Sequence, residues 1–478
     1  MIQNQNGLNK IVIVIMIGIF LCMLTGWGLY TLFSQKLIIA MYNGNSIGVL
    51  NKVINKNLEM PPPVEYYLER ASLSFFQFNS ICVLLLISCI RIILRQGGGR
   101  IKNLCRRSST VLIYLIVALI ILNSFMGKWG VGSYGKMPPC NNSIPTYTLF
   151  GMLDRTAEKP WIYRILMPTI VNLTTSLIPE EVLISKKEFF TKNSPLIKYI
   201  KTKGNWELKP IVKYHVVYIY LYLCLILILF SIRYLGKLIY VAPLMLLDFA
   251  PAVGLMLLPW TFQEAGYMYD FPDLLFTILC LICLIKRQLL SYYIIFFLAI
   301  LNKETSGILV LYFICTQYRN MLRSRLLKHT MFQLFSAAII IFTTERIYMA
   351  HQGMHLLWLL PEQLQFFLNP ATYICFFDPY CLGITTFPYT GNIILIVLFG
   401  FLIFYKWHEK PIEIRKLFVI ASAAMIPIFL CFGSHWEIRT LNICFPLMYL
   451  LMFHTVLMFY LEKFRNNKIE IQPEISRF

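Results

Sequence analysis

The sequence predicts an all-α membrane protein with about twelve transmembrane helices, within a range of roughly ten to thirteen. Hydrophobic residues make up 58% of its 478 residues and charged residues only 14%, whereas a soluble domain carries about 25% charged residues. The apolar residues form continuous runs, without the alternation expected of membrane-spanning strands. These observations exclude a soluble enzyme, and the whole chain, 1–478, is predicted to be a single polytopic domain.

The apolar runs give the candidate spans. A helix needs about 20 apolar residues to cross the hydrocarbon core. The first run is too long for a signal peptide and no small-residue cleavage site follows it, so we expect it to be retained. In chain order the runs are 11–33, 72–94, 110–126, 212–232, 238–260, 271–286, 289–301, 305–318, 330–349, 392–406, 417–433 and 441–461.

The net charge of +20 is explained by Lys and Arg residues in the short connections between spans. These connections all fall on one side of the membrane if both termini are cytoplasmic, as the positive-inside rule requires. There they meet anionic lipid head groups. Nucleic-acid binding is not expected, because the sequence offers no soluble basic face with interleaved aromatic residues.

Two of the runs, 289–301 and 305–318, are each too short to cross the membrane alone. Basic clusters flank the pair on both sides, which predicts a hairpin that enters from inside and turns near the outer face at 302–305. Irregular backbone at that depth requires surrounding protein or a wet cavity. A single long helix over 289–318 is the alternative, and it would reverse the topology of the later spans.

Large outer loops are predicted at 127–211 and 350–391. The first contains an amphipathic stretch, 161–178, which predicts an interfacial helix on the membrane surface. The second is rich in aromatic residues and proline. It contains Cys375 and Cys381, which would form a disulfide in an oxidising compartment.

Ionisable residues collect on the side opposite the basic connections. Many of them lie at span ends or in apolar surroundings, where a charge is costly and is a functional candidate by default. The residues of interest are Arg164, Tyr269, Asp270, Asp273, Lys303, Glu304, His435, Glu437 and Arg439.

Asp270 and Asp273 are spaced i, i+3 at the start of a helix and share one face. Capping of the helix and its dipole is one explanation, particularly for Asp273. For Asp270 we favour a role as a general base or metal ligand, because a half-dry cleft raises the pKa of a carboxyl group.

Each cation likewise has a functional and a structural interpretation. Lys303 is expected to hold a phosphate or a sugar hydroxyl while Glu304 orders the site, or the two form a structural ion pair. Arg439 suits a phosphate or a lipid head group. Arg164 stands beside aromatic residues, so it either binds substrate or belongs to an interfacial aromatic belt. Asp248, near the middle of the run 238–260, indicates an ion path or a satisfied helix break.

The succession Tyr163–Pro168, Tyr269–Asp273, Leu301–Thr305 and Glu437–Arg439 resembles the GT-C class of membrane glycosyltransferases, over roughly 160–450. The resemblance implies transfer of a sugar from a polyprenyl-phosphate donor to a glycan or lipid acceptor, on the non-cytoplasmic face of the cytoplasmic membrane. It implies catalysis by Asp270, Asp273 and Glu304, and binding of the sugar phosphate by Arg164, Lys303, Arg439, Glu437, His435 and Tyr269.

The chain departs from that class in its first outer loop, 34–71. The class usually carries two acidic residues close together there, and this loop has no Asp-x-Asp. Glu65 or Glu69 substitutes for the motif, or Asp270 does its work, or the chain is a non-catalytic relative. A divalent metal, Mg²⁺ or Mn²⁺, is left open because carboxylate pairs work with or without one.

Two other functions remain open. One is a polysaccharide polymerase or ligase that uses diphosphate-linked glycans, which would also require outer-face arginines. The other is a transporter or flippase, with Asp248 and the break at 302–305 as binding elements at the midplane. Against transport, no inverted repeat is visible and the polar residues gather on one face.

Overall fold

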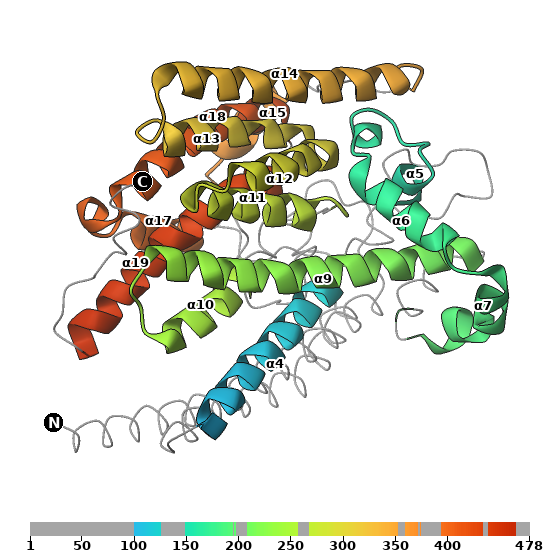
Figure 1. Cartoon of the computed structure of the whole chain (residues 1–478), viewed down its shortest axis with the longest axis horizontal. Coiled ribbons are helices and arrows are strands. Elements are labelled where there is room, and N and C mark those ends of the chain that lie inside the picture. The colour runs from blue at the N-terminus through green and yellow to red at the C-terminus, as the bar shows by residue number, and fades with distance from the viewer. Residues whose placement is uncertain are drawn as a thin grey trace. The chain divides into compact units, whose positions relative to one another are not determined.

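A computed structural model of the chain describes residues 100–125, 149–194, 196, 208–256, 267–351, 359–370, 373, 393–433 and 438–464. Every regular element in these ranges is a helix (Figure 1), as predicted for an all-α protein. The chain divides into two compact units, 1–120 with 375–389 and 121–374 with 390–478. The features described below lie in the second unit.

The first part of this unit follows the end of α4 (Arg100–Phe125) and covers the predicted outer loop 127–211. Its described residues form short helices: α5 (Leu149–Leu153), the 3₁₀ turn η2 (Trp161–Tyr163), α6 (Leu166–Ser176), α7 (Glu180–Ser185) and the π-turn η3 (Phe189–Asn193). The helix predicted over 161–178 is therefore present but interrupted between η2 and α6, where Arg164 leaves helical geometry with φ −88° and ψ 76°.

The remaining elements form the body of the unit. They are α9 (Leu208–Ile239), α10 (Leu244–Met256), α11 (Asp270–Ile285), α12 (Leu289–Asn302), η5 (Glu304–Ile308), α13 (Leu309–Gln317), α14 (Arg323–Ile347), α15 (Leu360–Leu368), α17 (Ile393–Phe404), η6 (Trp407–Glu409), α18 (Ile412–Phe432), η7 (Ile438–Cys444) and α19 (Phe445–Phe464). Nearly every residue of α11 is buried, because α9, α12, α13 and α19 pack around it.

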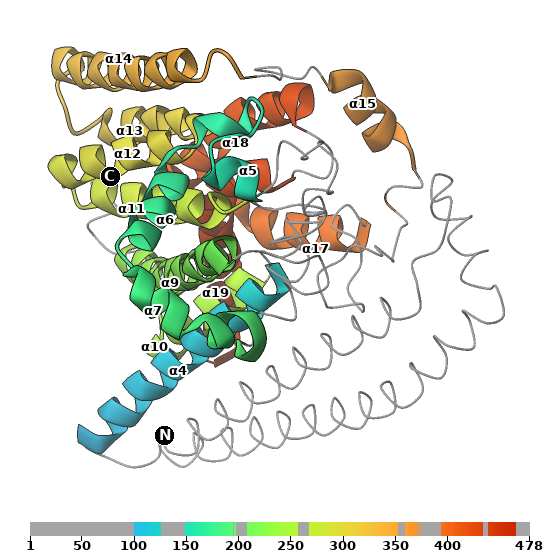
Figure 2. The ribbon, with the colours of Figure 1, turned by 90° about the vertical axis from the view of Figure 1, so that its right-hand side faces the viewer.

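Within the described residues, four helices are long and apolar enough to cross a membrane. One of them, α14, packs along α12 and α13 (Figures 1 and 2) and exposes Leu327, Met331 and Phe335 along one side. Such an apolar face is costly in water but natural against lipid. The four helices are Leu208–Ile239, Arg323–Ile347, Ile412–Phe432 and Ile438–Glu462.

The expected number of about twelve spans is not met by these described helices. The runs 11–33 and 72–94 lie outside the described residues. The other runs each contain a helix, but within the described residues α10 covers 13 residues, α12 covers 14 and α17 covers 12, short of the roughly 20 that a crossing needs. An apolar run includes residues of turns and 3₁₀ segments, so its length overestimates the helix within it.

The hairpin predicted over 289–318 is confirmed. Helix α12 ends at Asn302, Lys303 is extended at φ −159° and ψ 127°, and η5 leads into α13. The ring of Tyr292, near the start of α12, stacks on that of Phe313, in the middle of α13, at 5.6 Å. The Gln317 amide, at the end of α13, donates to the carbonyl of Leu284, just before the connection into α12, at 3.2 Å. The two helices therefore run antiparallel, and the alternative of one continuous helix is wrong.

Candidate functional site

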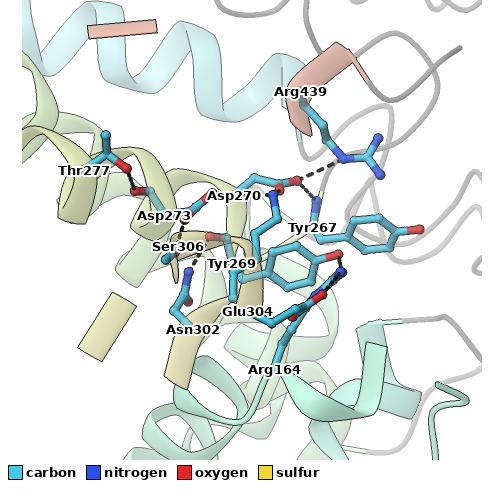
Figure 3. Close-up of polar contacts among 11 residues, drawn as sticks. Arg164, Tyr267, Tyr269, Asp270, Asp273, Thr277, Asn302, Glu304, Ser306 and Arg439 are labelled. Atoms are coloured by element: carbon cyan, nitrogen blue, oxygen red, sulfur yellow. Dashed lines mark hydrogen bonds and ion pairs between the residues drawn. The ribbon is translucent and has the colours of Figure 1, made fainter. Parts of the chain in front are cut away.

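Four segments far apart in the sequence bring six charged side chains together (Figure 3). We call this set the polar cluster: Arg164 follows η2, Asp270 and Asp273 lie in the first turn of α11, Lys303 and Glu304 lie at the break between α12 and η5, and Arg439 lies in η7. All six are among the residues that the sequence singled out. The cluster contains three cations and three carboxylates and is formally neutral.

The start of α11 is shaped by its own aspartates. The Asp270 carboxylate accepts a hydrogen bond from the backbone N–H of Tyr267 at 2.6 Å, so it fixes the turn that leads into the helix. Negative charge at a helix N-terminus also complements the helix dipole. No side chain caps the first amides of α11 through a hydrogen bond. Asp270 instead holds the turn before the helix, and the Asp273 carboxylate accepts a hydrogen bond from the hydroxyl of Ser306 at 2.7 Å.

The deep part of the cluster joins both aspartates to two cations. The Lys303 ammonium lies 3.5 Å from Asp270 Oδ1 and 3.4 Å from Asp273 Oδ2. The Nε of Arg439 lies 3.3 Å from Asp270 Oδ2. All four side chains are buried. Charges taken out of water must be paired to be tolerated, and this part of the cluster meets that requirement.

The extended residue at Lys303 explains how three consecutive side chains reach three partners. In extended backbone, successive side chains point to opposite sides. The Asn302 amide donates to the carbonyl of Tyr269 at 2.9 Å, Lys303 reaches the aspartates, and Glu304 turns to Arg164. The predicted structural pairing of Lys303 with Glu304 is therefore replaced by separate partners.

The outer part of the cluster is the pair of Arg164 and Glu304. Two guanidinium nitrogens, Nη2 and Nε, face the two carboxylate oxygens at 3.0 and 3.4 Å. This pair is more accessible than the deep part, since the Glu304 side chain is 32% exposed and that of Arg164 is 11% exposed. Arg164 also donates to the hydroxyl of Tyr269.

Burial and charge oppose each other at this pair. Burial alone would raise the pKa of Glu304, but the charge and hydrogen bonds of Arg164 outweigh it and hold the pKa below its usual value. Burial alone would lower the pKa of Arg164, and Glu304 outweighs it in the same way. Burial, together with the charges of Glu345 and Glu304, raises the pKa of the nearby Tyr163 to about 12.

Two stacked tyrosines separate the two arginines. The rings of Tyr267 and Tyr269 lie 5.1 Å apart with an interplanar angle of 14°. The guanidinium carbon of Arg164 lies 4.2 Å from the centre of Tyr269, and that of Arg439 lies 4.7 Å from the centre of Tyr267 (Figure 3). Cation–π contacts of this kind stabilise and orient a guanidinium group.

Several site residues were not singled out from the sequence. Tyr267, Asn302 and Ser306 all bond to the cluster or its backbone. Two signals point to them: polar residues within an apolar hairpin, and a second tyrosine two positions before Tyr269. His435 and Glu437, which were singled out, lie outside the described residues, as do Cys375 and Cys381.

Two other acidic residues pair away from the cluster. Asp248 is paired with Arg233 at 2.7 Å, so its charge is neutralised between α9 and α10. Asp154 pairs with Lys213 at 2.6 Å. Among the described residues, no group of three or more His, Cys, Asp or Glu side chains is placed to hold a metal ion.

Comparison of the chain with models of protein families, with curated proteins and with solved structures finds no match.

Proposed function

We propose that the chain is a membrane glycosyltransferase, which moves a sugar from a polyprenyl-phosphate donor to a glycan or lipid acceptor. The observation that supports this proposal is the polar cluster itself. It gathers Arg164, Lys303 and Arg439 from three separate segments at the ends of apolar helices. A reaction whose leaving group is a lipid phosphate requires such cations, and its lipid requires such helices.

The arginines suit the phosphate by geometry as well as by charge. A guanidinium group presents parallel N–H donors that match carboxylate and phosphate oxygens. Arg164 already binds a carboxylate with two of its nitrogens. Donors placed in advance where negative charge develops lower the barrier of a transfer reaction. The stacked rings of Tyr267 and Tyr269 keep both arginines in place.

We propose separate roles for Asp270 and Glu304, one in positioning and one as the general base. Asp270 is 2% exposed and is held by Lys303, Arg439 and the N–H of Tyr267. We therefore assign it a positioning role in place of the general base predicted from the sequence. The acceptor hydroxyl requires a base within hydrogen-bonding reach, and Glu304 is the more accessible carboxylate.

No metal step is included in the proposal. Asp270 and Asp273 are the paired carboxylates that would suit Mg²⁺ or Mn²⁺. The Lys303 ammonium lies within 3.5 Å of an oxygen of each, so a divalent ion between them would meet a positive charge. The residues present thus do not fit a metal at this position.

We further propose that the cluster faces the non-cytoplasmic side of the cytoplasmic membrane, with both termini in the cytoplasm and ten to thirteen spans in total. Helix α11 begins at the cluster and ends beside Lys286, and α12 begins after Arg287 and ends at the cluster. The basic connection therefore lies at the opposite ends of these helices. Basic connections favour the cytoplasmic side.

The test is the glycan profile, measured by mass spectrometry, of a host lacking this protein and complemented by wild type or single variants. We expect one sugar to be missing, and to be restored by wild type but not by Asp270→Asn, Glu304→Gln or Arg439→Ala at equal membrane levels. A full-size glycan that stays monomeric or unattached would indicate a polymerase or ligase instead. An unchanged profile would favour transport, and unchanged transfer in all three variants would reject the assigned site.

A further inference from the structure

The Arg164–Glu304 pair has the form of an occupied anion site. The carboxylate of Glu304 takes the Nε and Nη2 donors of Arg164 together. A phosphate group binds a guanidinium group through the same pair of donors. The Glu304 carboxylate thus occupies the two donors of Arg164 that a phosphate group would also bind.

Glu304 is also the carboxylate of the cluster that is best able to leave. Its side chain is 32% exposed, against 2% for Asp270 and 5% for Asp273. It stands at the first position of the five-residue turn η5, directly after the extended residue Lys303. A part-exposed ion pair is weaker than a buried one because water competes for both partners.

We propose that the donor phosphate displaces Glu304 from Arg164, and that the released carboxylate then accepts the proton of the acceptor hydroxyl. This inference rests on the function proposed above and assigns an order to the events at the same site. Binding of the donor creates the base, so the base is not available before the donor is in place.

The charges around Glu304 support this order. Arg164 is the group that holds the pKa of Glu304 below its usual value, against the effect of burial. When a phosphate takes over Arg164, that stabilisation of the carboxylate is lost and a further negative charge arrives, so the pKa of Glu304 must rise. The other charged or titratable groups that act here are Lys303 before η5, Tyr163 of η2 and Glu345 of α14.

The transfer step then balances without another reactant. The O–H proton of the acceptor passes to a Glu304 oxygen while the acceptor oxygen bonds to the anomeric carbon of the sugar. The bond from that carbon to the phosphate oxygen breaks, and its electron pair stays on the phosphate, beside Arg164. When the phosphate leaves, Glu304 loses its proton to solvent and returns to Arg164.

The experiment is calorimetric titration of the detergent-purified full-length protein with farnesyl phosphate, a short polyprenyl phosphate, near pH 6 in two buffers of different ionisation enthalpy. We expect Glu304→Gln to bind about three- to tenfold more tightly than wild type, because the competing carboxylate is gone. Both proteins share any proton exchange by the phosphate itself. Wild type should therefore take up more protons on binding than Glu304→Gln, because only wild type has the Glu304 carboxylate to protonate. Glu304→Gln should nevertheless lose sugar transfer.

Two further variants make the result specific. Arg164→Gln should weaken binding at least about tenfold. Glu413→Gln removes the carboxylate of a comparable pair, Arg319–Glu413 at 3.0 Å, and should leave affinity and proton uptake unchanged. If Glu304→Gln does not accumulate, Glu304→Asp tests the same point. Its carboxylate is one methylene shorter in reach and falls short of Arg164, so this variant should also bind the phosphate more tightly.

The outcomes separate this inference from the proposed function. Equal or weaker binding by Glu304→Gln, or proton uptake that survives the substitution, overturns the exchange. The proposed function would still stand in that case if Arg164→Gln loses binding and transfer. Failure of wild type to bind farnesyl phosphate at all would overturn both.

Discussion

The polar cluster and the Arg233–Asp248 pair are both charge networks with buried members, but the chain builds them differently. Arg233 and Asp248 lie 15 positions apart on the consecutive helices α9 and α10. Arg164 and Glu304 lie 140 positions apart, and the whole cluster draws on four segments. In the pair, Asp248 is 1% exposed while the Arg233 side chain is 32% exposed. The guanidinium group of Arg233 is therefore only partly removed from the protein surface.

This difference separates a local neutralisation from an assembled site. Asp248 pairs with an arginine on the preceding helix. The cluster instead buries Asp270, Asp273, Lys303 and Arg439 together, although taking each ion out of water costs several kcal/mol. Apolar residues would fill the same space at lower cost. We infer that the cluster serves chemistry, whereas the Arg233–Asp248 pair serves structure.

The largest expected effect is on transfer in Asp270→Asn. Loss of this charge removes a carboxylate partner from both Lys303 and Arg439. Both cations should shift, and we expect transfer to fall about 100-fold or more, as for lost electrostatic preorganisation. The measurement is sugar transfer in membranes, normalised to protein level. The matched control is Asp248→Asn, which should keep transfer within about threefold of wild type because it acts on structure alone. Equal losses in both variants would remove the contrast.

A smaller loss of transfer is expected for Arg439→Lys. Lysine keeps the positive charge but cannot reproduce both the contact with Asp270 and the stacking on Tyr267 at 4.7 Å. We expect about a tenfold loss of transfer, because an ammonium group cannot replace the stacking and the multiple donors of a guanidinium group. The loss should be larger in Arg439→Ala, which also removes the charge. Full activity in Arg439→Lys would show that charge alone suffices there.

The Arg233–Asp248 pair should affect stability instead of transfer. We expect Asp248→Asn to lower the free energy of unfolding by about 1–3 kcal/mol, as for a charge-assisted hydrogen bond lost from a buried acceptor. The loss of stability should stay moderate because the part-exposed Arg233 side chain can reorient towards the protein surface. Thermal unfolding in detergent measures it, with Asp154→Asn, from the more exposed pair with Lys213, as the control expected to change least.

The smallest expected effect is the acid sensitivity of the Arg164–Glu304 pair. The pKa of Glu304 is lower in the folded protein than its ordinary value of 4.5, so the pair contributes stability that is fully present above that value. As pH falls below 4.5 towards the folded pKa, this contribution is lost. Wild type should therefore lose more thermal stability than Glu304→Gln between pH 6 and 3.5, by less than about 1 kcal/mol because the pair is part-exposed. Parallel curves would contradict the pairing.

The sequence predicted the helices and the membership of the cluster better than it predicted lengths and pairings. Apolar runs located the helices, and the one-sided placement of polar residues located Arg164, Asp270, Asp273, Lys303, Glu304 and Arg439. Several described helices are shorter than the apolar runs that predicted them, because apolar turns and 3₁₀ segments extend a run without extending its helix. Both alternatives for the hairpin were consistent with its composition, and only the extended conformation of Lys303 decides between them.

The pairings within the cluster depend on backbone direction, which composition does not encode. Lys303 and Glu304 are neighbours of opposite charge, so an ion pair between them was one of the two expectations. Extended geometry sends them to different partners, Asp273 and Arg164. The role of Tyr267 as a stacking surface for Arg439 likewise depends on a contact between segments that are distant in sequence.

The single extended residue at Lys303 also sets a rule for which length changes this chain can accept. Asn302 bonds to Tyr269, and Ser306 bonds to Asp273, each across 33 positions. One added or deleted residue between these points would turn α12 by about 100° relative to α11 and move every side chain of the break to the wrong partner. Insertions should therefore be tolerated before Tyr267 or after α13, while the 33-residue spacing should stay fixed in any chain that performs the same reaction.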